Sequence, residues 1–140
     1  KKGVFVRLAV GNIANWNADA VAVSTNRQLL ANNSISYWRF QGRSNTNGAV
    51  HLAAGKELEH ACQLLSSKNS RGFQYGEAVV TPAFGNLSKI GCSHIVHVIT
   101  PDGMMVAVGG SDDHIQQLNF PLLQRSFSSC FKAAADTGAR

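Results

Sequence analysis

The chain has 140 residues, of which 44% are hydrophobic and 15% are charged, and its formal net charge is +5. This length favours one domain with a real core, and the low charge argues against intrinsic disorder. No apolar run approaches the ~20 residues that cross a bilayer, and no basic stripe indicates nucleic-acid binding. We therefore expect neither a membrane nor a nucleic acid among the partners.

The three cysteines, Cys62, Cys92 and Cys130, lie far apart in the chain. Such a set suits a reducing compartment better than a disulfide framework, so we expect an intracellular protein, cytoplasmic or nuclear. Cys62 and Cys130 fall on apolar helix faces and are expected in the core. Cys92 and His94 would lie on one face of a strand, and His97 would lie on the opposite face. A zinc site needs four converging ligands, which these residues alone do not supply, so we expect no metal site. We also expect no cofactor.

The expected elements begin with a strand over residues 4–10, where apolar residues alternate. The segment "ADAVAVS", from Ala18, is apolar on both faces and predicts a central strand. It ends abruptly on Ser24, Thr25 and Asn26. Ligands gather at the carboxyl ends of strands in open α/β sheets, so Asn26 is a candidate site residue.

Residues 31–47 form a polar stretch that is long for a loop, and loops of this length are usually functional or disordered. The aromatic residues within it could cover a core edge or line a ligand site. From Gly48 the apolar residues follow helical spacing as far as Leu65, which predicts one helix. Asn47 is well placed to cap that helix.

The second half of the chain predicts two strands and a helix. The strands are "EAVVTPAF" and "SHIVHVIT", over residues 77–84 and 93–100. The helix can start at Asp112 or Asp113, is expected to restart or kink at Pro121, and stops at Thr137 and Gly138. Strands alternating with helices indicate an α/β fold with a mixed or parallel sheet.

Four blocks of this sequence resemble the macro domain family of ADP-ribose-binding modules. In chain order they are "GNIANWNADAVAVSTNRQLL", "NGAVHLAAGKELEHAC", "GEAVVTPAFGNL" and "HIVHVITP". The pairing of "GAVHLAAG" with "GEAVVT" is the most specific, and the resemblance extends over residues 4–136. The resemblance implies a macro-domain-like three-layer α/β/α sandwich around a mixed sheet, with a ligand cleft at the strand ends.

The resemblance also implies where the ligand binds. Asn26 matches the asparagine that contacts the ribose in this family, and a helix starting near Gly48 offers backbone donors to a diphosphate. His51 and His97 are expected to be structural, and Glu77 to orient a loop. The ligand-binding residues implied are Asn12, Ile13, Ser24, Asn26, Gly42, Asn47, Gly48, Ala49 and Val50.

Three departures from the family pattern bear on function. Asn12 stands where many members carry an acidic residue whose carboxylate accepts a hydrogen bond from the adenine amino group. An amide can accept the same hydrogen bond, but without charge assistance the bond is weaker. Asn47 stands where the hydrolytic branch has aspartate, and an amide cannot act as a general base. The glycine-rich loop is thinned to Gly42 and Gly48, with Arg43 between them. If the chain is an enzyme, Asn26 and Asn47 are the best catalytic candidates.

The family fold continues beyond the last helix of this chain with further strands, which lie between the strand over 4–10 and the next one. We therefore expect residues 1–140 to be one macro-like domain that lacks its last strands and helix. A second chain or fragment would then complete the sheet.

Three functions remain open at this point. The first is a reader that binds ADP-ribose, a related nucleotide diphosphate or an ADP-ribosylated protein without turnover, which Asn47 favours. The second is an ADP-ribosyl hydrolase that uses groups other than an aspartate. The third is a degenerate module for protein–protein contact, which Asn12, Arg43 and the thinned glycines favour.

Overall fold

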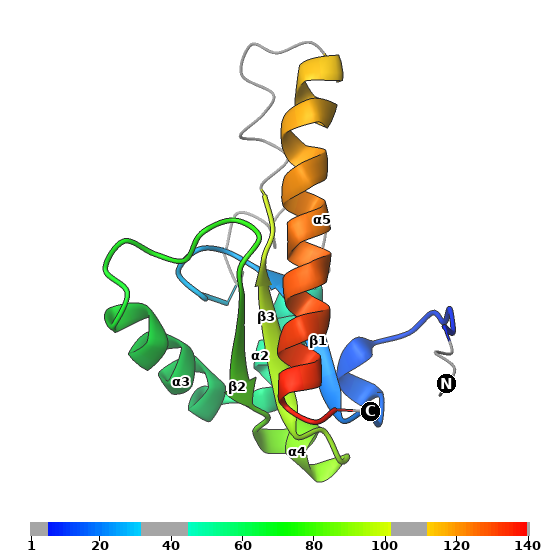
Figure 1. Ribbon diagram of the computed structural model, residues 1–140. Coiled ribbons are helices and arrows are strands. Elements are labelled where there is room, and N and C mark those ends of the chain that lie inside the picture. Colours follow the sequence, from blue (N-terminus) through cyan, green and yellow to red (C-terminus); the bar gives the residue numbers. More distant parts are fainter. Residues whose placement is uncertain (1–5, 32–44, 102–111, 140) are drawn as a thin grey trace, which may run out of the picture.

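The computed structural model describes residues 6–31, 45–101 and 112–139, with side chains from residue 120 onward in the last range. No helix in these ranges is both long enough and apolar enough to span a membrane. The elements, drawn in Figure 1, are η1 (Ile13–Asn15), β1 (Ala20–Thr25), α2 (Thr46–Ala54), α3 (Lys56–Ser67), β2 (Ala78–Pro82), α4 (Gly85–Lys89), β3 (His94–Ile99) and α5 (Asp112–Asp136).

The three strands form a mixed sheet in the order β1-β3-β2. β1 and β3 run parallel with Ala20 opposite His94, whereas β2 and β3 run antiparallel with Ala78 opposite Val98. The carboxyl ends of β1 and β3 therefore lie at the same end of the sheet. The predicted α/β class with a mixed sheet is confirmed.

Helices cover both faces of this sheet, which gives the three layers that the sequence implied. α2 packs against β1 and α3 against β2, while α5 packs against β3 and β2, as Figure 1 shows for α5. Side chains alternate accordingly along β1: Val21 and Val23 are buried, whereas Ala22 and Ser24 are exposed. A central strand buried on both faces was predicted here, and the second face of β1 is open instead.

β1 lies at the edge of the described sheet, and α5 packs against β3 and β2, which leaves this face of β1 open. The strand predicted over residues 4–10 is wrong for residues 6–10, which form no strand, and residues 4 and 5 lie outside the described ranges. Val6, Leu8 and Val10 are 94–101% exposed. A strand is stable only beside a neighbour, and no described strand lies beside this segment.

The single helix predicted from Gly48 to Leu65 is also wrong, because Gly55 divides it into α2 and α3. Gly55 has φ of +80°, and its N–H donates to the carbonyl of His51 at 2.9 Å. This left-handed conformation ends α2 as glycine commonly does at a helix C-terminus. The apolar spacing continues into α3, so periodicity alone did not reveal the break.

The last helix starts and ends where the sequence predicts, but Pro121 does not restart it. α5 continues through Pro121 from Asp112 to Asp136. Thr137 donates its hydroxyl to the carbonyl of Ala134 at 2.6 Å, and Gly138 has φ of +79°. Glycine just past the last turn is the expected stop.

One close approach fixes how α4 packs on α2. Gly85 has φ of +55°, and a Cβ atom there would lie 2.6 Å from the carbonyl oxygen of Ala54 and 2.7 Å from that of Ala53. Both contacts would be with backbone carbonyl groups, which cannot move aside as a flexible side chain could. The start of α4 therefore requires glycine.

We predict that Gly85→Ala destabilises the fold by about 2–5 kcal/mol, since it adds overpacking to left-handed strain. Gly138→Ala is the matched control, because Gly138 has a similar positive φ but nothing within 4 Å of its Cβ position. It should cost only about 1–2 kcal/mol. Urea unfolding of both variants measures the difference, and equal losses would contradict the close approach.

Candidate functional site

A tight turn at the carboxyl end of β1 carries the first candidate residue. The Asn26 side-chain oxygen accepts the N–H groups of Gln28 at 3.1 Å and Leu30 at 3.0 Å, and its Nδ2 donates to the Leu30 carbonyl at 3.0 Å. These bonds enclose Leu29, which is fully buried with φ of +57°. Asn26 thus holds a conformation that a leucine rarely adopts.

Asn47, in the first turn of α2, reaches the same turn from the other side. Its side chain is only 3% exposed, and its Nδ2 lies 3.3 Å from both Thr25 Oγ1 and the Leu30 carbonyl. The amides of Asn26 and Asn47 therefore donate to one carbonyl oxygen. We call the turn at residues 26–30 and the first turn of α2 the amide corner.

Two polar groups of the amide corner keep hydrogen-bonding capacity. The buried Oδ1 of Asn47 has no hydrogen-bond partner among the described residues. The Asn26 amide nitrogen carries two hydrogens, and one of them serves Leu30. The corner can therefore accept one hydrogen bond through Asn47 and donate one through Asn26.

The start of α2 differs from the predicted one. Asn45, not Asn47, is the N-cap: its Oδ1 accepts the Gly48 N–H at 2.8 Å, and its carbonyl accepts the Ala49 N–H at 3.0 Å. The expected donors at Gly48 and Ala49 are therefore used within the helix, and Val50 is fully buried. Thr46 and Asn47 fill the first helical positions, whose N–H groups lack intrahelical acceptors.

The other predicted ligand-binding residues lie outside the amide corner. The Asn12 side chain caps η1 by accepting the Ala14 N–H at 3.0 Å, and Ile13 packs against the core. Ser24 points to the α5 face of the sheet, away from Asn47. Gly42, with Arg43 and the aromatic residues of the same loop, lies outside the described ranges.

Arg27 joins the amide corner to the loop before β2, a role that sequence reasoning missed. Its Nε donates to the Phe73 carbonyl at 2.7 Å and its Nη2 to the Arg71 carbonyl at 3.2 Å. Its guanidinium lies 5.7 Å from the centre of the Tyr75 ring. In the same loop Glu77 accepts the Gln74 N–H at 2.8 Å, as predicted. The cation at position 27 is therefore bound to protein carbonyls.

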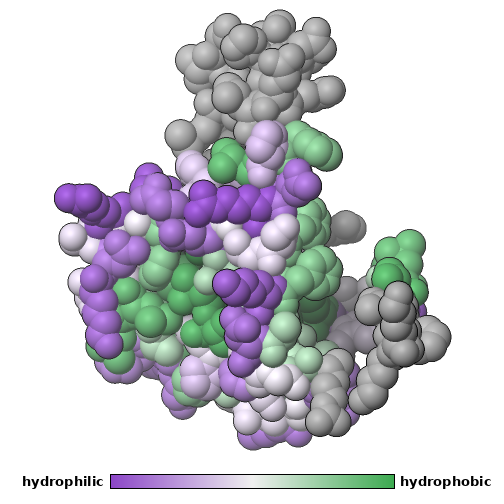
Figure 2. Space-filling view, in the orientation of Figure 1, coloured by the Kyte–Doolittle hydropathy of each residue, from purple (hydrophilic) through white to green (hydrophobic). Residues whose placement is uncertain are grey.

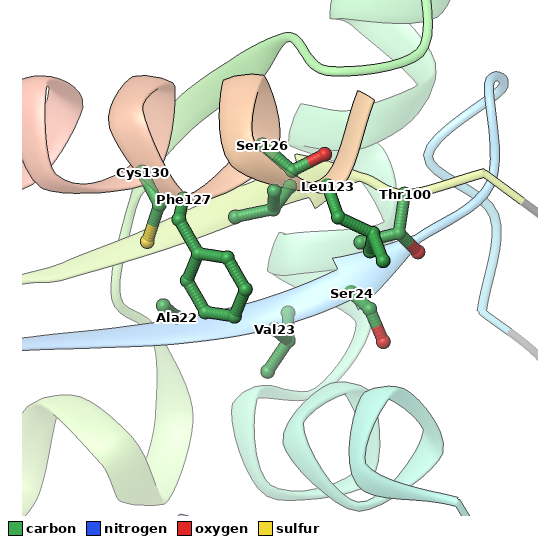
Figure 3. Close-up of a pocket in the computed structure, with 9 residues that line it drawn as sticks. Ala22, Val23, Ser24, Thr100, Leu123, Ser126, Phe127 and Cys130 are labelled. Carbon is green, nitrogen blue, oxygen red and sulfur yellow. The ribbon is translucent and has the colours of Figure 1, made fainter. Parts of the chain in front are cut away.

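A cavity of about 240 Å³ lies on the opposite face of the sheet, beneath α5. Figure 3 shows Phe127 reaching from α5 towards β1, and hydrophobic surface runs alongside α5 in Figure 2. Because the lining is mostly apolar, the cavity does not suit a diphosphate. It is lined by Ala22, Val23, Ser24, Val98, Thr100, Leu123, Ser126, Phe127 and Cys130.

Between the sheet and helices α2 and α3 lies a buried group of titratable residues. His97 is fully buried and His51 is 6% exposed, which agrees with the prediction that both histidines are structural. Burial, with a smaller contribution from His51, lowers the pKa of His97 to about 4. Burial also lowers the pKa of His51 and raises the pKa of the Cys62 thiol to about 11. All three groups are therefore uncharged at neutral pH.

The lowered pKa of His97 predicts acid sensitivity. The unfolded chain takes up this proton near pH 6.5 and the folded chain only near pH 4, so the free energy of unfolding falls as the pH drops between these values. The loss reaches about 3 kcal/mol from His97. Urea unfolding between pH 7.5 and pH 4 tests this. His97→Gln should make the profile less steep, and a profile of unchanged slope in that variant would contradict this role of His97.

Comparison with protein families assigns the class of this fold. The Macro domain family model matches residues 26–139, and the chain belongs to the macro domain family. A macro domain-containing protein of Mesorhizobium japonicum is 27% identical over 96% of this chain and 57% of its own length. O-acetyl-ADP-ribose deacetylase 1 of Pantoea vagans is 30% identical over 87% of this chain and 57% of its own.

Solved macro domains share the fold. The Oceanobacillus iheyensis macrodomain with ADP has a TM-score of 0.67 at 21% identity, over 93% of this chain and 57% of that one. The Oryza sativa APL macrodomain in complex with ADP-ribose has a TM-score of 0.66 at 20% identity, over 91% of this chain and 60% of that one. The chain thus spans little more than half the length of these similar proteins.

Proposed function

We propose that this macro domain is a reader that binds ADP-ribose, or a related nucleotide diphosphate, at the amide corner. The observation that carries the proposal is the meeting of the Asn26 and Asn47 amides at the Leu30 carbonyl. It joins the carboxyl end of a parallel strand to a helix N-terminus, the two features that favour nucleotide phosphates. Similar solved macrodomains hold ADP or ADP-ribose.

The polar groups of the corner suit a ribose. A sugar hydroxyl can donate to the buried Asn47 Oδ1 and accept the remaining Asn26 amide hydrogen, with no charge to desolvate. The N–H groups of Thr46 and Asn47, at the positive end of α2, offer the donors that a phosphate requires. Asn12, Ile13, Ser24 and Gly42 stay predictions, as do an ADP-ribosylated protein partner, an intracellular location and a segment completing the sheet.

We predict that Asn47→Ala weakens ADP-ribose binding about tenfold, because a buried acceptor for the ligand is lost. Isothermal calorimetry with the 140-residue chain measures the change. Asn86→Ala is the control, since Asn86 is exposed on α4, at the opposite end of the sheet from the amide corner (Figure 1). Equal affinity in both variants would remove Asn47 from the site. Absence of binding heat from the wild-type chain would instead favour the degenerate interaction module.

A hydrolase is the second candidate, because relatives of this chain are O-acetyl-ADP-ribose deacetylases at 28–30% identity. The amide at position 47 argues against it, since it cannot take a proton from water. We expect no release of acetate from O-acetyl-ADP-ribose and no loss of label from an ADP-ribosylated protein above the buffer rate. Turnover by the wild-type chain above the buffer rate would replace the reader with an enzyme.

A further inference from the structure

Three side chains with soft or borderline metal-binding atoms meet in the core beneath the amide corner. His51 comes from α2, Cys62 from α3 and His97 from β3, and none is more than 6% exposed. One ring nitrogen from each histidine and the Cys62 sulfur lie within 4.8 Å of one another. Three elements that are separate in the chain thus bring three potential ligands to one point.

Two atoms of this cluster are buried without a hydrogen-bond partner in the described part of the chain: Nε2 of His51 and Nδ1 of His97. A buried polar atom left unpaired costs folding free energy. His97 Nε2, in contrast, lies 3.0 Å from Thr81 Oγ1 and 4.0 Å from Cys62 Sγ. The cluster therefore has two unpaired ring nitrogens among the described residues, and a hydroxyl that fixes the orientation of one ring.

We propose that His51, Cys62 and His97 supply three of the four ligands of a single Zn²⁺ ion in the core of this domain. Imidazole nitrogen and thiolate sulfur are ligands that zinc prefers, and the cluster contains no carboxylate that would favour Mg²⁺ or Ca²⁺. Zinc bonds of ~2.0–2.3 Å place tetrahedral ligand atoms roughly 3.3–3.8 Å apart. The present spread of 4.8 Å must therefore contract by about 1 Å on binding.

Binding changes the protonation of one group and the oxidation state of none. The Cys62 thiol loses its proton to the solvent as the sulfur–zinc bond forms, and the neutral imidazoles bind through their lone pairs. Thr81 Oγ1 contacts the same His97 nitrogen, Nε2, that lies 4.0 Å from Cys62 Sγ, so this hydrogen bond is given up if Nε2 binds the ion. The ion would join α2 and α3 across the Gly55 break and fix both helices to β3.

Cobalt titration of the chelator-treated chain tests the proposal, because Co²⁺ replaces Zn²⁺ and its bond to a thiolate absorbs in the near ultraviolet. We expect that band to grow to a stoichiometric end point and to disappear when Zn²⁺ is added. Cys62→Ser should abolish it. Cys130→Ser, at the half-buried cysteine of α5, should leave it unchanged.

A second variant covers the case in which Cys62→Ser does not fold. Cys92→Ser/Cys130→Ser leaves Cys62 as the sole cysteine, so a band that persists in this double variant comes from Cys62. Zinc should also raise the unfolding temperature of this variant, since it binds only the folded arrangement. A folded wild-type chain without the band, or a band that survives in Cys62→Ser, would overturn the proposal.

Discussion

The Leu30 carbonyl is the acceptor on which the amide corner depends. Two amides donate to it, one from the turn after β1 and one from the first turn of α2. The turn encloses a buried leucine in a left-handed conformation, which the Asn26 side chain holds by pairing the turn's N–H groups. Asn26, which matches the asparagine that contacts the ribose in the macro domain family, therefore also has a structural role. A change at Asn26 disturbs the site and the fold together.

Asn47 likewise donates to the Leu30 carbonyl and to Thr25 Oγ1, so a change at Asn47 also affects the fold. Its Oδ1 is buried and has no partner in the described part of the chain, a state that proteins rarely leave uncompensated. A ligand hydroxyl would supply the missing partner. The buried imidazoles below α2 show the same pattern, with one unpaired nitrogen on each ring. Two sets of polar groups near α2 thus lack partners among the described residues: Asn47 Oδ1 in its first turn, and the ring nitrogens of His51 and His97 below its second turn. The first set suits a sugar hydroxyl, and the second set suits a metal ion.

The edge of β1 and the cavity beneath α5 have a common cause. β1 is paired on one side only in the described sheet, and its residues Ala22 and Ser24 line the cavity beneath α5 together with Phe127, which remains 65% exposed. Residues 6–10 keep a strand-like alternation without forming a strand. An additional strand against β1 would give these apolar groups a partner, which is the completion that the resemblance led us to expect.

The sequence by itself determined the α/β class and the three strands, because periodicity encodes these directly. The resemblance to the macro domain family led us to expect Asn26 beside the helix near Gly48. The sequence could not reveal the break at Gly55, the capping by Asn45 or the failure of residues 6–10 to pair, since glycine, asparagine and alternating residues each permit several structures. Only the tertiary structure brought His51, Cys62 and His97 together, because contacts between distant elements depend on packing and leave no spacing in the chain.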